Sequence, residues 1–186
     1  MARVIVGMAM SLDGFVNDRS GSVSRLYPDL EALRKTEVLQ EAIKTTGAVV
    51  MGRHAYDMAE GDFTGYEFQV PIFVLTHHAP IKAAKGENGR LRFNFITDGI
   101  ESAMEKARSA AGDDKYVTVV GGANTFQQCI NKRLFDELEI DLVPVLLGGG
   151  LRLFEHISAE NINLEIMSVI ESPWVTHLRY HVVKEN

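Results

Sequence analysis

The fold is decided by the stretch Val117-Thr118-Val119-Val120-Gly121-Gly122-Ala123-Asn124-Thr125-Phe126. An apolar, β-branched run stops there at two glycines and is followed by a helical pattern, which predicts a strand, a tight turn and a helix. Backbone N–H groups at the start of such a helix carry partial positive charge, and glycine lets a ligand approach them closely. The stretch therefore predicts either a phosphate-binding turn or an ordinary connection between a strand and a helix.

The composition is that of a globular protein. The chain has 186 residues, of which 46% are hydrophobic and 24% charged, which favours a single domain spanning residues 1–186. A net charge of −6 disfavours a nucleic-acid partner, and the apolar runs are too short to cross a membrane. The lone Cys129 permits no internal disulfide, and the chain enters an apolar strand within a few residues of Met1. We therefore expect a cytoplasmic protein.

Three other apolar runs end in the same way as the strand before Gly121. Residues 3–10 precede an Asp-Gly turn, residues 48–51 precede Gly52-Arg53, and residues 70–75 precede Thr76-His77. Helical patterns separate most of these runs, so the strands are predicted to be parallel. Parallel strands bind ligands at their C-terminal ends, so we expect the four ends to form one rim.

The remaining patterns complete an α/β fold. One amphipathic helix is predicted from Asp29 to a C-cap at Gly47, and another from an N-cap at Asp98 to Gly112. Residues 58–69 predict a loop.

Strands with alternating polarity are predicted from residue 137 onward, and the short break at Ser172-Pro173 indicates that the last two pair antiparallel. The sequence thus predicts a mainly parallel sheet of about eight strands with antiparallel C-terminal strands and helices on both faces.

The polar residues at the predicted rim favour a phosphorylated ligand. Arg53 begins a helix beside a glycine, and Thr76 and His77 follow another strand, so several phosphate oxygens could be held together. The G-x-G-x-x-G fingerprint of Rossmann dehydrogenases is absent. If the ligand is a dinucleotide, this basic and hydroxyl cluster favours NADPH over NADH.

Four motifs in order resemble those of the dihydrofolate-reductase-like family. They are Met10-Ser11-Leu12-Asp13-Gly14, Met51-Gly52-Arg53-His54-Ala55-Tyr56, Val119-Val120-Gly121-Gly122-Ala123, and Pro144-Val145-Leu146-Leu147-Gly148-Gly149-Gly150-Leu151-Arg152-Leu153-Phe154 following Glu137-Leu138. More closely, the chain resembles the C-terminal reductase domain of riboflavin-biosynthesis deaminase/reductases and its stand-alone relatives. The resemblance spans nearly the whole chain.

The resemblance implies an NADPH-dependent reductase that transfers a hydride to a pterin-like or ribosylaminopyrimidine-type small molecule. It places the cofactor phosphates against Gly52, Arg53, His54, Leu75, Thr76, His77, Val120, Gly121, Gly122, Ala123, Asn124 and Thr125, and the nicotinamide against Ala9, Met10, Gly14, Phe15 and Val16. Hydride transfer depends mainly on alignment of cofactor and acceptor. We therefore expect neither a nucleophile nor a metal.

Substrate residues are harder to assign. Asp29 is the nearest match to the acid that holds the pterin in dihydrofolate reductases, although it also suits a helix N-cap. The family's tryptophan before it is missing, which disfavours folate reduction, and one cysteine cannot form the zinc site of a deaminase. Arg152 is either a substrate-phosphate contact or a surface residue, and Asp13 is either a substrate contact or a turn residue.

Two functional classes follow from these observations. The first is a small NADPH-dependent oxidoreductase, and the second is a non-catalytic or regulatory NADPH-binding protein that has lost its substrate pocket. Apolar residues such as Val175 and Val183 on the second face of an antiparallel sheet edge further predict a homodimer that covers them.

Overall fold

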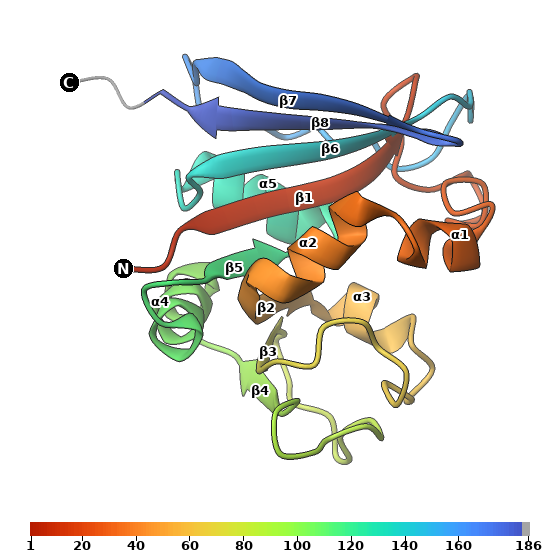
Figure 1. Cartoon of the computed structure of the whole chain (residues 1–186). Helices are drawn as coiled ribbons and strands as arrows, with labels where there is room; N and C mark the ends of the chain where they lie inside the picture. The colour runs from red at the N-terminus through yellow and green to blue at the C-terminus, as the bar shows by residue number, and fades with distance from the viewer. Residues whose placement is uncertain (184–186) are drawn as a thin grey trace.

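The computed structural model describes residues 1–183, which form one sheet of eight strands (Figure 1). The strand order is β4-β3-β2-β5-β1-β6-β8-β7. The strands are β1 (Val4–Ser11), β2 (Thr46–Gly52), β3 (Ile72–Leu75), β4 (Phe93–Ile96), β5 (Tyr116–Val119), β6 (Glu137–Val143), β7 (Leu164–Ser172) and β8 (Val175–Val182). All pairs from β4 to β6 are parallel, whereas β8 runs antiparallel to both β6 and β7. The predicted fold class is confirmed.

Helices cover both faces of the sheet (Figure 1). They are α1 (Leu30–Arg34), α2 (Glu37–Thr45), α3 (Arg53–Asp57), α4 (Ile100–Ala111) and α5 (Ala123–Asn131). On one face, α4 and α5 bury Met104 and Phe126 against Val6 and Val119 of the central strands. On the other face, α2, α3 and the 58–69 loop pack against alternate residues of β2 and β3, with Tyr56 at the centre of an aromatic cluster. Successive side chains of a β-strand point to opposite faces of the sheet, so the same strands contribute residues to the hydrophobic cores on both faces. Within residues 1–183, no helix is both long and apolar enough to cross a membrane.

The helix predicted from Asp29 to Gly47 is two helices. The Thr36 hydroxyl donates to the Leu33 carbonyl at 2.7 Å and also accepts from the Leu39 N–H at 3.3 Å. Thr36 thereby ends α1 and provides the N-cap of α2, which is a role that threonine favours over a helix interior. Gly47 is not a C-cap, because the chain passes from Thr46 directly into β2 and Gly47 lies at an irregularity of that strand.

The start of α4 also differs from the prediction. Gly99 is the N-cap, and the Asp98 carboxylate instead accepts from the Ser102 hydroxyl at 2.9 Å. The predicted end at Gly112 is confirmed, with φ of 75°.

The C-terminal strands form a hairpin at one edge of the sheet. Ser172 pairs with Val175, so Pro173 and Trp174 alone make the turn. Contrary to the prediction, Val175 does not lie on an exposed edge, because β8 is enclosed between β6 and β7. The edge strand is β7, and it exposes Ile166, Val169 and Ile170. β6 ends at Val143, and the next residues form a loop.

Candidate active site

The C-terminal ends of β2 and β5 lie side by side. The Gly52 N–H donates to the Gly121 carbonyl at 2.7 Å, and the Val120 N–H donates to the Val50 carbonyl at 3.0 Å. A Cβ on Gly52 would lie 2.5 Å from the Thr125 hydroxyl oxygen, so only glycine fits at this crossing. The peptide bond between Gly121 and Gly122 is cis. Residues 120–125 are thus held against the start of α3 by backbone contacts.

Helix α5 begins immediately after these glycines. Gly122 is its N-cap, and no side chain among residues 1–183 caps it. The N–H groups of Ala123, Asn124 and Thr125 precede the first intrahelical bond, which Phe126 donates to Gly122 at 3.1 Å. No described atom lies within 4 Å of the position that a Cβ on Gly122 would take, so the space beside the helix start is open. The arrangement suits an anion.

Arg53 links this crossing to the end of β3. Its Nε donates to both carboxylate oxygens of Asp57 at 2.8 and 3.0 Å, and its Nη1 donates to the His78 carbonyl at 3.1 Å. The Thr76 hydroxyl donates to the same carbonyl at 2.9 Å. Arg53 and Thr76 are therefore close together, as predicted, but Asp57 offsets part of the positive charge. We call Gly52, Arg53, Thr76 and residues 121–125 the rim.

The other residues predicted to bind the cofactor fall into exposed and buried groups. His54, His77 and Asn124 are exposed, whereas Leu75, Val120 and Met10 are half-buried at the strand ends. Phe15 and Val16 are 7% and 5% exposed. Their side chains therefore belong largely to the core, and Gly14 precedes them in the turn.

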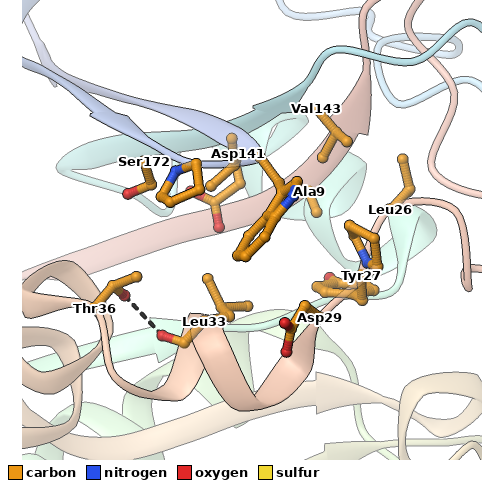
Figure 2. Close-up of a pocket in the computed structure, with 13 residues that line it drawn as sticks. Ala9, Leu26, Tyr27, Asp29, Leu33, Thr36, Asp141, Val143 and Ser172 are labelled. Atoms are coloured by element: carbon orange, nitrogen blue, oxygen red, sulfur yellow. Dashed lines mark hydrogen bonds between the residues drawn. The ribbon is translucent and has the colours of Figure 1, made fainter.

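A separate pocket opens on the other side of β1 from the rim (Figure 2). Its cavity volume is about 30 Å³. The sheet contributes Ala9, Asp141, Val143, Ser172 and Val175. The opposite wall comes from the segment before α1, from Leu33 of α1 and from Thr36, the N-cap of α2. The lining residues are Ala9, Leu26, Tyr27, Pro28, Asp29, Leu33, Thr36, Asp141, Val143, Ser172, Pro173, Trp174 and Val175. This set defines the pocket below.

Only one of the three predicted substrate residues lies at the pocket. Asp29 lines it, and its carboxylate accepts from the Ala32 N–H at 2.9 Å, so Asp29 is also the N-cap of α1. Asp13 and Arg152 are not among the residues that line the pocket. Asp29 is therefore the one predicted substrate residue that lines this pocket, and the substrate roles of Asp13 and Arg152 stay predictions.

Asp13 instead ties two loops together. Its carboxylate accepts from the Ser11 hydroxyl at 2.7 Å and from the N–H groups of Leu147 and Gly148 at 3.1 and 2.8 Å. These hydrogen bonds, led by that from Ser11, lower the pKa of Asp13 to about 2. Asp13 is thus a loop-fixing residue, in line with its alternative interpretation as a turn residue.

Arg152 packs on the same turn. Its guanidinium lies 4.4 Å from the centre of the Phe15 ring, and its Nη1 donates to the Asp13 carbonyl at 3.3 Å. Both interactions position the turn after β1.

The sequence interpretation missed the polar residues of the pocket. The alternating polarity from residue 137 onward assigns no site role to Asp141, yet β6 places it between Ala9 of β1 and His177 of β8. The sequence offered one signal, the three acidic residues at 137, 139 and 141. The structure shows that their strand, β6, is paired on both sides. Burial and the charge of Asp141 raise the pKa of the Tyr27 phenol to about 12. The pocket therefore combines apolar walls with a negative charge.

The sequence of the chain matches one protein family along most of its length. The profile of the family described as the RibD C-terminal domain matches residues 2–178. The chain belongs to the RibD C-terminal domain family. Among curated relatives of this RibD C-terminal domain, the protein YyaP of Bacillus subtilis (strain 168), described as uncharacterized, is 25% identical over 185 residues, covering 96% of this chain and 94% of YyaP.

Solved structures show the same fold. A protein from Shewanella sp. PV-4, provisionally described as a riboflavin biosynthesis protein, has a TM-score of 0.78 at 23% identity and covers 99% of this chain and 100% of its own. A Thermotoga maritima diaminohydroxyphosphoribosylaminopyrimidine deaminase/5-amino-6-(5-phosphoribosylamino)uracil reductase has a TM-score of 0.74 at 14% identity, covering 98% of this chain and 57% of its own. The Enterococcus faecalis dihydrofolate reductase, complexed with NADP(H), has a TM-score of 0.63 at 18% identity, covering 98% of this chain and 97% of its own. The resemblance stated from the motifs is confirmed.

Proposed function

We propose that this RibD C-terminal domain is an NADPH-dependent reductase that transfers a hydride to a small heterocycle of the ribosylaminopyrimidine or pterin type. The observation that carries the proposal is the position of β1 between the rim and the pocket. Ala9 of β1 lines the pocket and is predicted to contact the nicotinamide. A cofactor held at the rim and an acceptor held in the pocket would then meet across one strand.

The rim residues fit a dinucleotide. The uncapped start of α5 and the open space beside Gly122 would hold the pyrophosphate, because unpaired N–H groups and the helix dipole favour an anion. Arg53 and Thr76 would hold a phosphate on the adenosine ribose, which favours NADPH over NADH. When bound, NADPH supplies the hydride. The chain supplies alignment and exclusion of water.

The pocket suits a flat polar ring better than a large ligand. Tyr27, Pro28, Pro173 and Trp174 provide apolar and aromatic walls, and Asp141 can accept hydrogen bonds from ring N–H or amino groups. Asp29 could do the same from the opposite wall, with the carboxylate oxygen that does not cap α1. The T. maritima relative is named for a ribosylaminopyrimidine reductase activity, which supports this substrate class.

The non-catalytic alternative assumed that the substrate pocket had been lost. The presence of a lined pocket beside Ala9 favours the reductase over that alternative.

The reductase proposal is tested by following NADPH oxidation with a panel of acceptors that includes the ribosylaminopyrimidine phosphate and dihydrofolate. We expect turnover with the pyrimidine and little with dihydrofolate. Binding of NADPH without turnover on any acceptor would support the non-catalytic alternative. Failure to bind NADPH would contradict both.

We also propose that β7 is covered by a second copy of the chain. Ile166 and Val169 are 70% and 60% exposed on an unpaired edge strand, which is a surface that monomers usually protect. We expect a dimeric mass by light scattering and a monomeric mass for Val169→Lys. Glu165→Lys, on the same strand, is the control for the added charge. A monomeric wild-type protein would contradict this proposal.

A further inference from the structure

A chain of hydrogen bonds runs from the pocket into the sheet and back. Asp141 and Ser172 both line the pocket, and Figure 2 shows them on its sheet side, opposite Leu33 and Thr36. His177 lies between them, with its Nδ1 2.5 Å from the Asp141 carboxylate and its Nε2 3.0 Å from the Ser172 hydroxyl. His177 is 4% exposed. The imidazole is thus buried, but both of its partners face the pocket.

The three hydrogen-bonded residues Asp141, His177 and Ser172 come from the neighbouring strands β6, β8 and β7. Asp141 of β6 pairs with Ala9 of β1 on one side and with His177 of β8 on the other. Side chains of directly paired residues lie on the same face of a sheet. Ser172 ends β7, two residues after Ile170, which pairs with His177, so Ser172 is a diagonal neighbour of His177 on the same face. The series of hydrogen bonds therefore begins at Asp141, beside Ala9, the residue predicted to contact the nicotinamide.

We propose that Asp141, His177 and Ser172 form a proton relay that delivers a proton from Ser172 to the substrate in the pocket. This inference rests on the proposed reductase function. Reduction of a C=N or C=O bond adds a hydride to carbon and a proton to the heteroatom, and the hydride carries both electrons. Only the proton has to come from the chain or from water.

The relay conserves charge and atoms. The Ser172 O–H bond breaks as the heteroatom–H bond forms, and Ser172 regains a proton from Nε2 of the His177 imidazolium. His177 is left neutral, with its Nδ1–H still donated to the Asp141 carboxylate, which stays ionised. Water restores the proton on His177 after the product leaves. Ser172 is the catalytic residue of this step, and His177 and Asp141 act through it.

The surroundings of His177 favour its protonated form. Burial lowers the pKa of His177. The hydrogen bond that His177 donates to the Asp141 carboxylate and the negative charges of Asp141 and Glu139 outweigh burial and raise the pKa above its usual value. Arg179, on the same face of β8, opposes this effect, although Glu137 binds its guanidinium at 2.6 Å. Tyr27 adds no charge near neutral pH, because a phenol is protonated there and its raised pKa keeps it so at higher pH as well. On β7, the residue opposite His177 is the apolar Ile170.

The same three residue types form the nucleophilic triads of hydrolases, but one feature opposes that function here. A serine nucleophile commonly uses the backbone N–H of the next residue to stabilise the oxyanion. The next residue here is Pro173, which has no N–H. The geometry therefore favours proton transfer over acyl transfer.

The first test measures His177 in the protein without ligands. Imidazole NMR titration should give His177 a pKa above the usual value for histidine. Asp141→Asn should lower the pKa of His177. A usual pKa for His177 that Asp141→Asn leaves unchanged would overturn the relay.

The second test follows turnover. We expect kcat for the wild type to fall as pH rises above the pKa of His177, because the neutral imidazole cannot reload Ser172. His177→Gln and Ser172→Ala should each lower kcat by about 100-fold, leave NADPH affinity within about twofold and remove this pH dependence. Ser172→Thr should restore most of the activity because it keeps the hydroxyl. His181→Gln is the matched control and should behave as wild type.

The outcomes separate the relay from the function on which it rests. Absence of turnover in the wild type with every acceptor would overturn both. Turnover that His177→Gln leaves unchanged would overturn the relay alone. Labelling of Ser172 by a fluorophosphonate would also overturn it, because it would identify a nucleophile.

Discussion

The rim and the pocket lie on either side of β1, but they are built from different parts of the chain. The rim consists largely of backbone at the ends of β2 and β5, and each of these strands is followed directly by a glycine and the start of a helix. The pocket consists of side chains from residues 9 to 175, brought together by four strands and the segment around α1. A site made of backbone can be recognised from a short motif. A site made of scattered side chains depends on which strands are neighbours.

The largest expected effect comes from adding a side chain to the backbone-built rim. Gly52→Ala would place a Cβ 2.5 Å from the Thr125 hydroxyl and 3.4 Å from the Gly122 nitrogen. We expect NADPH affinity to fall by about 100-fold, or ~2.7 kcal/mol, measured by calorimetry. Gly89→Ala is the control, because no described atom lies within 4 Å of its added Cβ. Unchanged affinity in Gly52→Ala would refute a cofactor site at this crossing.

A smaller effect is expected for the side chain that supplements the rim. Arg53→Ala should weaken NADPH binding about tenfold, or ~1.4 kcal/mol, because one phosphate contact is lost. NADH binding should change less, since NADH lacks the ribose phosphate. Asp57→Asn should not weaken NADPH binding, as the carboxylate that offsets the charge of Arg53 is removed. If Arg53→Ala lowered the affinities for NADPH and NADH equally, Arg53 would contact a part of the cofactor other than the ribose phosphate.

Asp29 tests whether a pocket residue serves the substrate or the fold. Asp29→Ala should lower the free energy of unfolding by about 1 kcal/mol, because the N-cap of α1 is lost. Asp29→Asn can still accept the hydrogen bond from Ala32 and should keep that stability. Because Ser172 is the proposed proton donor, kcat should also survive in Asp29→Asn. A large loss of kcat in this stable variant would instead make Asp29 the catalytic acid.

The smallest expected effect concerns Asp13, a motif residue that belongs to neither site. The fold lowers its pKa, so its ionised form stabilises the folded state above pH ~3.8, and this contribution disappears as pH falls towards ~2. Asp13→Ala should therefore melt slightly below the wild type at pH 7, and the difference should shrink in acid. Thermal melts across this pH range measure the effect. A pH-independent difference would mean that the Asp13 charge is not involved.

The sequence alone determined the parallel part of the sheet and the rim. Runs such as residues 117–120 are β-branched and uncharged, and a glycine directly after such a run marks a point where backbone can approach backbone closely. These signals are local, so they can be recognised in the sequence without knowing which strands lie next to each other. The split of the first helix at Thr36 was missed, because a threonine that caps one helix and ends another looks like any other residue in an amphipathic pattern.

Only the tertiary structure decided the pocket and the proposed relay. Asp141, Ser172 and His177 are separated by up to 36 residues, and nothing in their spacing relates them. They meet because β8 inserts between β6 and β7. This order places His177 directly opposite Asp141 on β6 and diagonally beside Ser172 on β7. Sheet order is set by the long-range packing of whole strands, so a contact that depends on it cannot be read from the residues that make it.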